Sequence, residues 1–319
     1  MPNTTQPVRG RFAPSPSGRM HLGNIFCAII CWLSARSAGG SLVLRIEDLD
    51  TLRCTKQNAA VLIDDLRWLG LDWDEGPDIG GPNFPYYQSD RFDIYAEKLA
   101  MLEEKGLVYP CFCSRAEIHA ANAPHFSDGS VVYAGTCRHL SAEELAEKSK
   151  KRAPALRLVV PDREYHYVDG HYGPGGENLA QNCGDFILRR SDGVYAYQLC
   201  VIVDDILMGV NQVVRGRDLL GSIPRQNYLY ELLGAPTPQY FHIPMLVAPD
   251  GRRLSKREAD LDLGELRSRY PSPEVIIGRL AHRCGLLERE EPISAQELLP
   301  LFDWSKLSKE DIVIRPGDF

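Results

Sequence analysis

The residues best suited to chemistry lie in the stretch Gly10–Asn24, where a short strand meets a proline- and glycine-rich loop and then a helix. Apolar residues from Ile25 onward repeat with a helical period. Such a junction collects unpaired backbone N–H groups and the positive end of the helix dipole, so it suits an anionic phosphate. Gly18 and Gly23 leave room for a close approach, and His21 adds a ring donor. An ordinary strand-to-helix loop with a packed histidine is the alternative.

A carboxylate follows the next predicted strand. Residues 41–46 are apolar enough for a buried strand, and the acidic run Glu47–Asp50 begins where that strand ends. Ligands of open α/β sheets bind beyond the carboxyl ends of the strands, so we expect Glu47 near the same crevice as His21. The alternative is a carboxylate that is merely solvated.

Three of the nine cysteines are spaced as metal ligands could be. Cys111 and Cys113 form a Cys-x-Cys pair, and Cys137 follows. Three thiolates supply most of a tetrahedral zinc shell, whereas buried free thiols are the alternative. The ordinary fourth ligand is a histidine, and three histidines lie nearby: His119, His125 and His139.

The composition indicates a soluble globular protein of two or three structural units. The chain has 319 residues, of which 44% are hydrophobic and 25% charged. No apolar run approaches the roughly 20 residues of a membrane span, and the first residues do not resemble a signal peptide, so we expect a cytoplasmic protein without membrane contact. The net charge of −7 argues against non-specific coating of nucleic acid, but a local basic face could still dock a folded RNA.

The elements that must position these groups alternate between strands and helices. Their order predicts an α/β fold in which a parallel sheet has helices on both sides. The turn Ser191–Gly193 predicts a hairpin whose second strand covers 194–199. We expect four parts: 1–108 as the first half of the sheet domain, 109–182 as an insertion, 183–257 as the second half, and 258–319 as a helical C-terminal portion.

Two motifs resemble those of class I aminoacyl-tRNA synthetases in their glutamyl form. His21–Asn24, with the residues before it, looks like the HIGH signature, and Arg253–Arg257 looks like the KMSKS loop. The segment Arg45–Asp50 resembles a second glutamyl-specific stretch. The resemblance covers about residues 9–270 and implies a Rossmann-like class I catalytic domain with an inserted zinc-containing subdomain that faces the substrate or acceptor.

The resemblance implies that the site activates an amino acid with ATP. This reaction is attack of a carboxylate on the α-phosphate, so a catalyst mainly positions two anions and neutralises charge. His21 and Lys256 would be catalytic, ATP with Mg²⁺ would bind at His21, Gly23, Asn24 and Lys256, and an exposed loop lysine is the alternative for Lys256.

The amino acid implied by the resemblance is L-glutamate. Arginine forks suit its carboxylates, and a glutamate side chain suits its ammonium group. The positions that match the glutamate-binding residues of the family are Arg11, Phe12, Ala13, Pro14, Ser15, Glu47, Tyr197 and Arg215. The alternative for both arginines is an ion pair with Asp204, Asp205 or Asp218.

The resemblance also implies the zinc ligands and the acceptor. Relatives show Cys-x-Cys followed by Tyr-x-x-x-Cys, which favours Tyr133 as fourth ligand beside Cys111, Cys113 and Cys137 of one structural Zn²⁺, although a phenol is an unusual ligand. Full-length glutamyl enzymes continue well beyond the KMSKS loop as an anticodon-reading domain, which we do not expect in a chain ending at residue 319.

The expected protein is therefore a short paralogue, most simply a monomer, that transfers glutamate to the queuosine base at the wobble position of tRNA(Asp). One alternative is a truncated enzyme that charges tRNA(Glu), and the other is a non-catalytic synthetase-like module that binds RNA.

Overall fold

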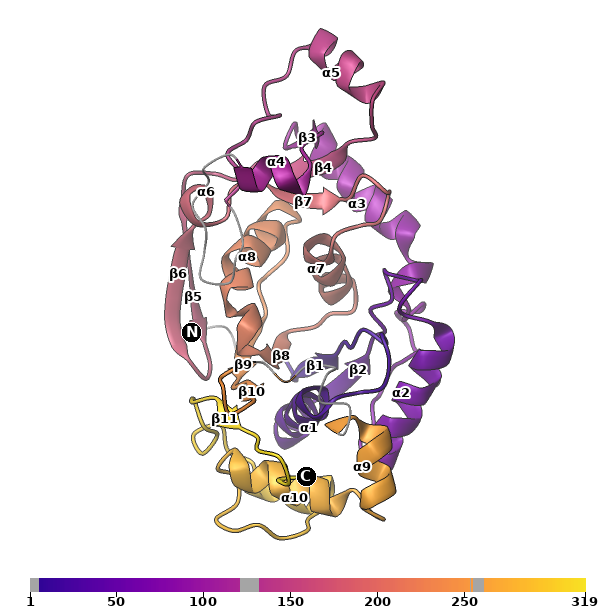
Figure 1. Ribbon diagram of the computed structural model, residues 1–319, viewed down its shortest axis with the longest axis vertical. Coiled ribbons are helices and arrows are strands. Elements are labelled where there is room, and N and C mark those ends of the chain that lie inside the picture. The colour runs from indigo at the N-terminus through magenta and orange to yellow at the C-terminus, as the bar shows by residue number, and fades with distance from the viewer. Residues whose placement is uncertain (1–5, 121–131, 253, 255–260) are drawn as a thin grey trace.

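The computed structural model describes residues 6–120, 132–252, 254 and 261–319. The molecule is elongated, with the central sheet strands between the predicted insertion at one end and the C-terminal helices at the other (Figure 1). Among the described residues, no helix combines the length and apolar character that a membrane span requires.

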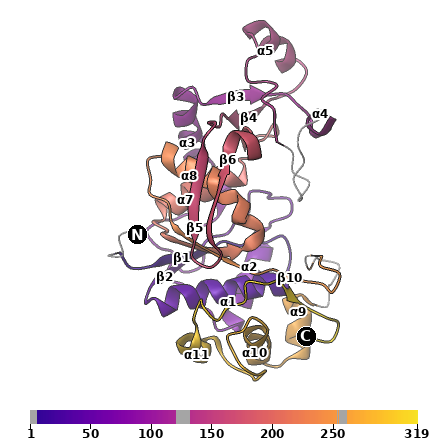
Figure 2. The same cartoon turned by 90° about the vertical axis from the view of Figure 1, so that its left-hand side faces the viewer.

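The first part of the chain forms two parallel strands and the helices that cover them. Strands β1 (Arg9–Phe12) and β2 (Ser41–Leu44) pair in parallel and are joined by α1 (Leu22–Ser37). Helix α1 is buried along most of its length, which agrees with its position between β1 and β2 on one side and the C-terminal helices on the other (Figure 2). The remaining elements of this part are α2 (Lys56–Trp68), η1 (Gln88–Asp90) and α3 (Phe92–Glu104).

A four-stranded sheet continues the fold, in the order β6-β5-β9-β8, in which β5 is Glu164–Asp169 and β6 is Gly173–Asn178. Strands β8 (Gln212–Gly216) and β9 (Gln239–Ile243) are parallel, as predicted for an α/β fold. The start of strand β8 lies beside β1. The side-chain oxygen of Asn211, the residue before β8, accepts a hydrogen bond from the Arg9 N–H at 2.7 Å. The helices of this part are α7 (Tyr197–Leu207), η2 (Arg217–Ser222) and α8 (Ile223–Leu232).

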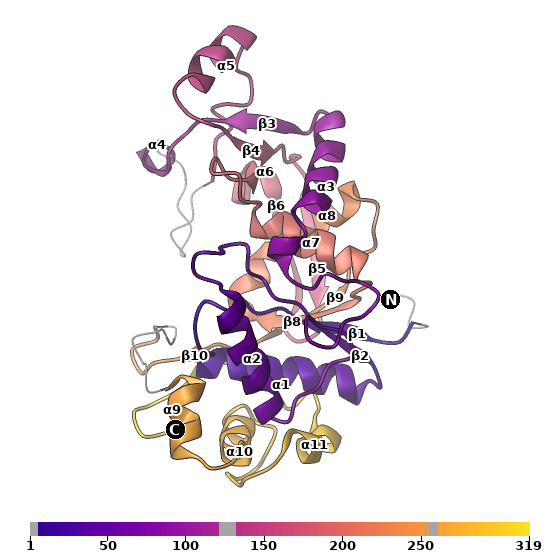
Figure 3. The ribbon, with the colours of Figure 1, turned by 90° about the vertical axis from the view of Figure 1, so that its right-hand side faces the viewer.

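The predicted insertion covers one end of the molecule, and its last two strands run along the middle of the molecule as part of the four-stranded sheet (Figure 3). Its elements are β3 (Val108–Cys111), α4 (Arg115–Ala120), α5 (Ala142–Ser149), β4 (Ala155–Leu158), β5 (Glu164–Asp169), β6 (Gly173–Asn178) and α6 (Leu179–Asn182). Strand β7 (Phe186–Arg189) pairs with β4, and β5 pairs with β9, so sheet pairing crosses the predicted boundary at residue 182. The division into four parts remains a prediction.

The C-terminal portion contains several short helices, and its apolar residues share a hydrophobic core with α1. It contains α9 (Leu263–Arg269), α10 (Glu274–Arg283), α11 (Ala295–Leu298) and η4 (Leu299–Leu301). A short parallel pair, β10 (Leu246–Val247) with β11 (Ile312–Val313), ties its last residues to the segment just before the KMSKS-like loop.

One predicted strand is wrong. The turn around Gly193 forms, with a φ of 87° and a bridge between Arg189 and Tyr195, but the expected second strand at 194–199 gives way to helix α7 at Tyr197. The apolar run that follows is a helix buried on several sides, and such a run lacks the periodicity that separates helix from strand. The correction matters because it places Tyr197 in the first turn of a helix.

The close packing of α10 gives a test of the fold. A Cβ at Gly278 would lie 1.8 Å from the Glu291 carbonyl oxygen. We expect Gly278→Ala to lower the free energy of unfolding by about 1–3 kcal/mol, because backbone must move to accept the methyl group. Urea denaturation measures this, and Gly23→Ala in α1 is the matched control, since no heavy atom lies within 4 Å of a Cβ there. Equal stability of the two variants contradicts the packing.

Candidate active site and metal centre

The first signature loop lies beside the acidic segment that follows β2. The Arg45 N–H donates to the Phe12 carbonyl at 3.0 Å, and the Glu47 N–H donates to the Pro14 carbonyl at 3.0 Å. The parallel ladder of β1 and β2 therefore continues past the strand ends and holds Glu47 against the loop. Ala13 is partly exposed and Ser15 exposed, whereas the Phe12 side chain belongs to the hydrophobic core, so a ligand can reach Phe12 only through its backbone.

His21 is the residue that precedes helix α1. Its backbone is extended and its carbonyl accepts from the N–H groups of Asn24 and Ile25, at 2.8 and 3.1 Å. Gly23 is partly exposed and Asn24 exposed. The first turn of a long helix is thus accessible at the predicted ATP position, with donors that a helix leaves unpaired.

The second signature motif lies largely outside the described residues, which include Leu254 but not Arg253, Ser255, Lys256 or Arg257. The segment that follows it is described and contacts the first motif. His21 forms an antiparallel bridge with Asp262, and the Leu263 N–H donates to the Met20 carbonyl at 2.8 Å. The chain that leaves the second motif therefore runs alongside His21, while convergence of Lys256 itself remains a prediction.

A cluster of ion pairs fastens the same two segments together. The buried Asp65 of α2 accepts from Arg19 of the first loop at 2.8 Å and from Arg267 of α9 at 2.9 Å. Arg267 also pairs with Asp64 at 2.7 Å. One buried carboxylate thus links the loop before His21 to the helix after the second motif.

Behind the candidate amino-acid site lies a buried network of charges centred on Arg45. This side chain is 0% exposed and contacts three carboxylates: Asp205 at 2.7 Å, Glu47 at 3.3 Å and Asp204 at 3.6 Å. Asp204 also accepts from Arg91 at 2.7 Å, Gln88 at 2.8 Å and Tyr95 at 2.9 Å. Both aspartates lie on α7, so the network fixes that helix against the end of β2.

Arg11 and Arg215 differ in how their charges are balanced. The buried Arg11 has its Nε 3.7 Å from an Asp205 carboxylate oxygen and donates to the Val214 carbonyl at 2.9 Å. The ion pair considered as its alternative is therefore present. Arg215 is also buried, at 5% exposure, but among the described residues its guanidinium has only neutral hydrogen-bond partners: His242 at 2.9 Å and the Leu219 carbonyl at 3.2 Å.

Tyr197 and Glu47 share the surroundings of these arginines. Burial raises the pKa of Tyr197, and the charges that act on its phenol include those of Arg215, Glu47 and Arg11, so the hydroxyl stays protonated at neutral pH. Burial also raises the pKa of Glu47 to about 6, although Arg45 and Arg11 oppose this. Four of the sequence-predicted glutamate-binding side chains thus lie within electrostatic reach of one another.

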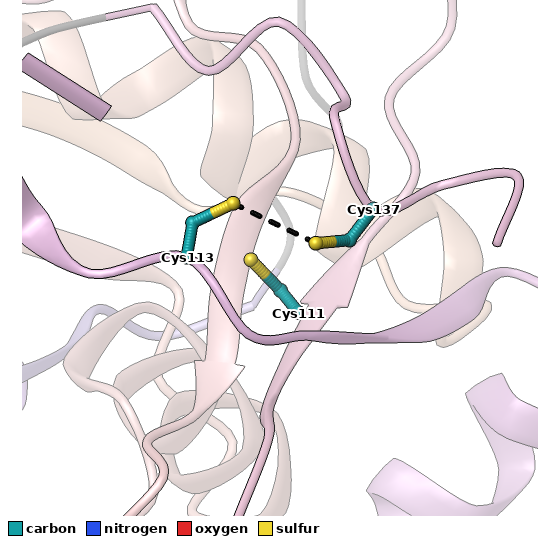
Figure 4. Close-up of side chains that lie close together, drawn as sticks. All are labelled: Cys111, Cys113 and Cys137. Carbon is teal, nitrogen blue, oxygen red and sulfur yellow. Dashed lines mark hydrogen bonds between the residues drawn. The ribbon is translucent and has the colours of Figure 1, made fainter. Parts of the chain in front are cut away.

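The three predicted metal-binding cysteines come together (Figure 4). The sulfur atoms of Cys111, Cys113 and Cys137 lie within 4.8 Å of one another, as ligands of one tetrahedral ion would. The Tyr133 hydroxyl lies 3.3 Å from the Cys111 sulfur and 3.6 Å from that of Cys113. Burial opposes ionisation of Cys111, but hydrogen bonds and the nearby Arg157 guanidinium outweigh it and lower the pKa of this thiol. The cluster is compatible with a zinc site.

Of the three histidines considered as a fourth ligand, the structure describes the side chain of His139, and it lies outside this cluster. His139 is exposed and is not part of the group of potential ligands found among the described residues. His125 and the side chain of His119 lie outside what the structure describes. Tyr133, 6% exposed, is the oxygen donor that lies against the thiols.

Sequence reasoning missed the buried residues that support the site. Arg45 was part of a recognised segment, yet only its complete burial shows that it is the centre of the network. Asp169 and His242, both buried, were not singled out, although an acidic residue or histidine inside an otherwise apolar strand is a signal that it has a partner.

Together, the sheet, the strand-to-helix loop and the buried charges define a class I aminoacyl-tRNA synthetase catalytic domain. The family model described as "tRNA synthetases class I (E and Q), catalytic domain" matches residues 7–315. A glutamate tRNA ligase from Elizabethkingia meningosepticum, crystallised in complex with its amino acid, has a TM-score of 0.82 and 30% identity to this chain, covering 97% of it and 67% of the ligase.

Relatives that the chain covers over nearly their whole length narrow the family. The chain is 48% identical over 309 residues to a glutamyl-Q tRNA(Asp) synthetase of Symbiobacterium thermophilum, covering 96% of this chain and 95% of that protein. It is 49% identical to that of Nitratidesulfovibrio vulgaris, covering 98% and 96%. A glutamate–tRNA ligase of Alkalilimnicola ehrlichii is 44% identical, but only 61% of its length is covered. The chain belongs to the glutamyl-Q tRNA(Asp) synthetase branch of the class I glutamyl and glutaminyl synthetase family.

The raised pKa of Glu47 makes stability depend on pH. Its pKa is about 6 in the folded protein against an ordinary value of 4.5, so between these values the folded state binds more protons than the unfolded one. The free energy of unfolding therefore falls as pH rises through this range, by about 2 kcal/mol in total between about pH 3 and 7.5. We expect Glu47→Gln to lose this component, so that its stability rises by about that amount relative to the wild type over the same interval. Urea denaturation across this range measures it, and a difference that does not vary with pH contradicts it.

Proposed function

We propose that the protein activates L-glutamate with ATP and transfers it to queuosine in tRNA(Asp). An oxygen of the glutamate α-carboxylate attacks the α-phosphorus of ATP, pyrophosphate leaves, and glutamyl-adenylate forms. A hydroxyl of the modified base then attacks the activated carbonyl and AMP leaves.

The observation that carries this proposal is the buried Arg215 guanidinium, whose direct hydrogen-bond partners among the described residues are all neutral. The other buried arginines nearby, Arg11, Arg45 and Arg91, each pair directly with a carboxylate of Asp204 or Asp205. A buried charge without a counterion is costly, and a bound carboxylate relieves that cost. Arg215 is therefore suited to the side-chain carboxylate of glutamate, while Glu47 and the Tyr197 hydroxyl suit its ammonium group.

The accessible start of α1 supports the ATP half of the proposal. The partly exposed Gly23 lies in the first turn of the helix, a position that suits a phosphate, and His21 stands at the same end of the helix. Lys256 would neutralise charge on the transferring phosphoryl group from the other side, and Mg²⁺ would accompany the phosphates. Both roles rest on the match of these positions to the family motifs.

The acceptor is inferred from the similar proteins of matching length, which are glutamyl-Q tRNA(Asp) synthetases. Unstacked bases in an anticodon loop are the accessible part of a folded RNA, so a base there is a reasonable acceptor for an exposed active site. Charging of tRNA(Glu), the activity in the name of the longer glutamate–tRNA ligases, is the second candidate because those proteins also match the chain. A cytoplasmic location and a monomeric state remain predictions.

For the insertion, we infer one structural Zn²⁺ held by Cys111, Cys113, Cys137 and Tyr133. The fit rests on the sulfur positions and on the phenol oxygen placed against two of them. The Arg157 guanidinium lies 3.8 Å from the centre of the Tyr133 ring, where its positive charge would offset the excess negative charge of three thiolates and a phenolate. The ion would cross-link β3 to the segment that carries Cys137.

Labelled glutamate tests the proposed reaction. We expect glutamate-dependent ATP–pyrophosphate exchange without tRNA, and transfer of glutamate to tRNA(Asp) that contains queuosine but not to the same tRNA without it. Arg215→Ala should raise KM for glutamate by about 100-fold or more, because it removes a charge-assisted bidentate contact, with little change in KM for ATP. Gly23→Ala is the complementary variant, with an effect on ATP rather than glutamate.

Three results separate the candidates. Exchange that requires tRNA, with transfer to tRNA(Glu), would favour the charging enzyme. Absence of exchange with glutamate under all conditions would leave a binding module and refute the proposal. Equal effects of Arg215→Ala on the two substrates would remove this residue from the carboxylate site.

Elemental analysis tests the zinc proposal. Protein purified without chelator should contain about one zinc per chain, and Cys137→Ser should reduce this content and lower the melting temperature, because a structural zinc contributes to folding. Tyr133→Phe keeps the ring and its packing but removes the oxygen donor, so we expect zinc to bind more weakly while the thiolates remain. Wild-type protein without stoichiometric metal contradicts the site.

A further inference from the structure

Three buried side chains form a row across the four-stranded sheet. Asp169 ends β5, His242 lies on β9, and Arg215 lies on β8 directly opposite His242. The Asp169 carboxylate is 2.6 Å from the His242 Nδ1, and the Arg215 Nε donates to the His242 Nε2 at 2.9 Å. Asp169, His242 and Arg215 are 1%, 0% and 5% exposed. The imidazole therefore connects a carboxylate to the arginine that the proposed function assigns to glutamate.

The hydrogen bonds of this row determine the state of the imidazole. Because the Arg215 Nε always carries hydrogen, the His242 Nε2 must accept, and the single ring proton must lie on Nδ1 and point to Asp169. Burial lowers the pKa of His242, although the hydrogen bond to Asp169 acts in the opposite direction. The lowered pKa keeps the imidazole neutral. Burial disfavours ionised Asp169, but bonds from His242 and the N–H groups of Tyr172 and His171 outweigh this and lower its pKa.

A neutral imidazole does something for Arg215 that a carboxylate could not. It fixes the direction of Nε, and the Leu219 carbonyl fixes Nη2, so the plane of the guanidinium is set by two contacts. Neither contact supplies a negative charge to Arg215. In contrast, Arg45 has three carboxylates around it, and their charges would compete with an anionic ligand. The two contacts orient the Arg215 guanidinium without neutralising its positive charge, which can then attract an anionic substrate.

Asp169 also holds the turn after β5, where its carboxylate accepts from the His171 and Tyr172 N–H groups at 3.0 and 2.8 Å. A purely structural role would be limited to that turn and to burial of His242. It would not explain why the lone pair of the imidazole is directed at the one arginine of the network that lacks an acidic partner among the described residues.

We propose that Asp169 and His242 are positioning residues that hold Arg215 for the glutamate side-chain carboxylate and thereby set affinity for glutamate and discrimination against glutamine. The inference rests on the proposed function. Asp169 acts by fixing the tautomer of His242, and His242 acts by offering a neutral acceptor to Arg215.

The kinetics of tRNA-independent ATP–pyrophosphate exchange test the positioning role of Asp169 and His242. In Asp169→Asn, the amide can donate to Nδ1 and shift the ring proton to Nε2, which then opposes the Arg215 N–H donor. We expect KM for glutamate to rise at least about tenfold, the preference over glutamine to fall, and kcat and KM for ATP to change less than about twofold, since the loss concerns uniform binding of one substrate.

Two substitutions of His242 separate orientation from packing. His242→Gln keeps an uncharged acceptor for Arg215, whereas His242→Leu fills the space without one. We expect the glutamine variant to retain most of the affinity for glutamate and the leucine variant to lose it. Tyr172→Phe is the matched control beside Asp169, because its hydroxyl contacts the Lys309 carbonyl outside the row, and it should leave KM for glutamate unchanged.

The outcomes distinguish this inference from the proposed function. Wild-type protein without glutamate-dependent exchange refutes the proposed function. Active wild type with equal KM for glutamate in the glutamine and leucine variants overturns the positioning role, even where Asp169→Asn does not fold. A parallel rise in KM for ATP and glutamate, with a matching loss of melting temperature, identifies a structural role only and also overturns it.

Discussion

The burial of Arg45 is the constraint on which the rest of the site depends. A guanidinium with 0% exposure is tolerated only because carboxylates from β2 and α7 surround it. Removal of one partner from a buried ion pair costs about 3–5 kcal/mol, far more than a surface pair contributes. The network therefore requires helix α7 to pack in one position, and that position brings its first residue, Tyr197, beside Glu47 and Arg215.

The need to balance a buried charge also distinguishes the arginines that stabilise the fold from the one that we propose for a ligand. Arg45 and Arg91 are fully matched by acidic partners, and Arg11 has a longer contact with Asp205 at 3.7 Å. Arg215 is held by an imidazole and a carbonyl. Because a neutral partner leaves the charge of a guanidinium unmatched, the hydrogen-bond partners, rather than burial or residue type, distinguish the arginine that we propose for the glutamate carboxylate.

The sequence could predict those parts of the site that local patterns encode. The strand-to-helix loop around His21, the carboxylate after β2 and the cysteine spacing each follow from residues close together in the chain, and the structure contains all three features. The helix at Tyr197 was mistaken for a strand because its apolar run is buried on several sides. The row Asp169–His242–Arg215 could not be predicted, since it exists only through the pairing of β5, β9 and β8.

The segment after α11, which contains Trp304 and Ser308, packs against residues close in the chain to Asp169 and His242. The Trp304 ring stacks on Phe241 with 4.6 Å between centroids, next to His242, and also contacts His171 at 5.6 Å. The His171 Nε2 donates to the Ser308 carbonyl at 3.1 Å. The turn that Asp169 holds and the strand that carries His242 are thus packed against one C-terminal segment. The His242 imidazole orients Arg215 only while both of its neighbours stay fixed. The order of the proposed glutamate site therefore depends on contacts made by residues far along the chain.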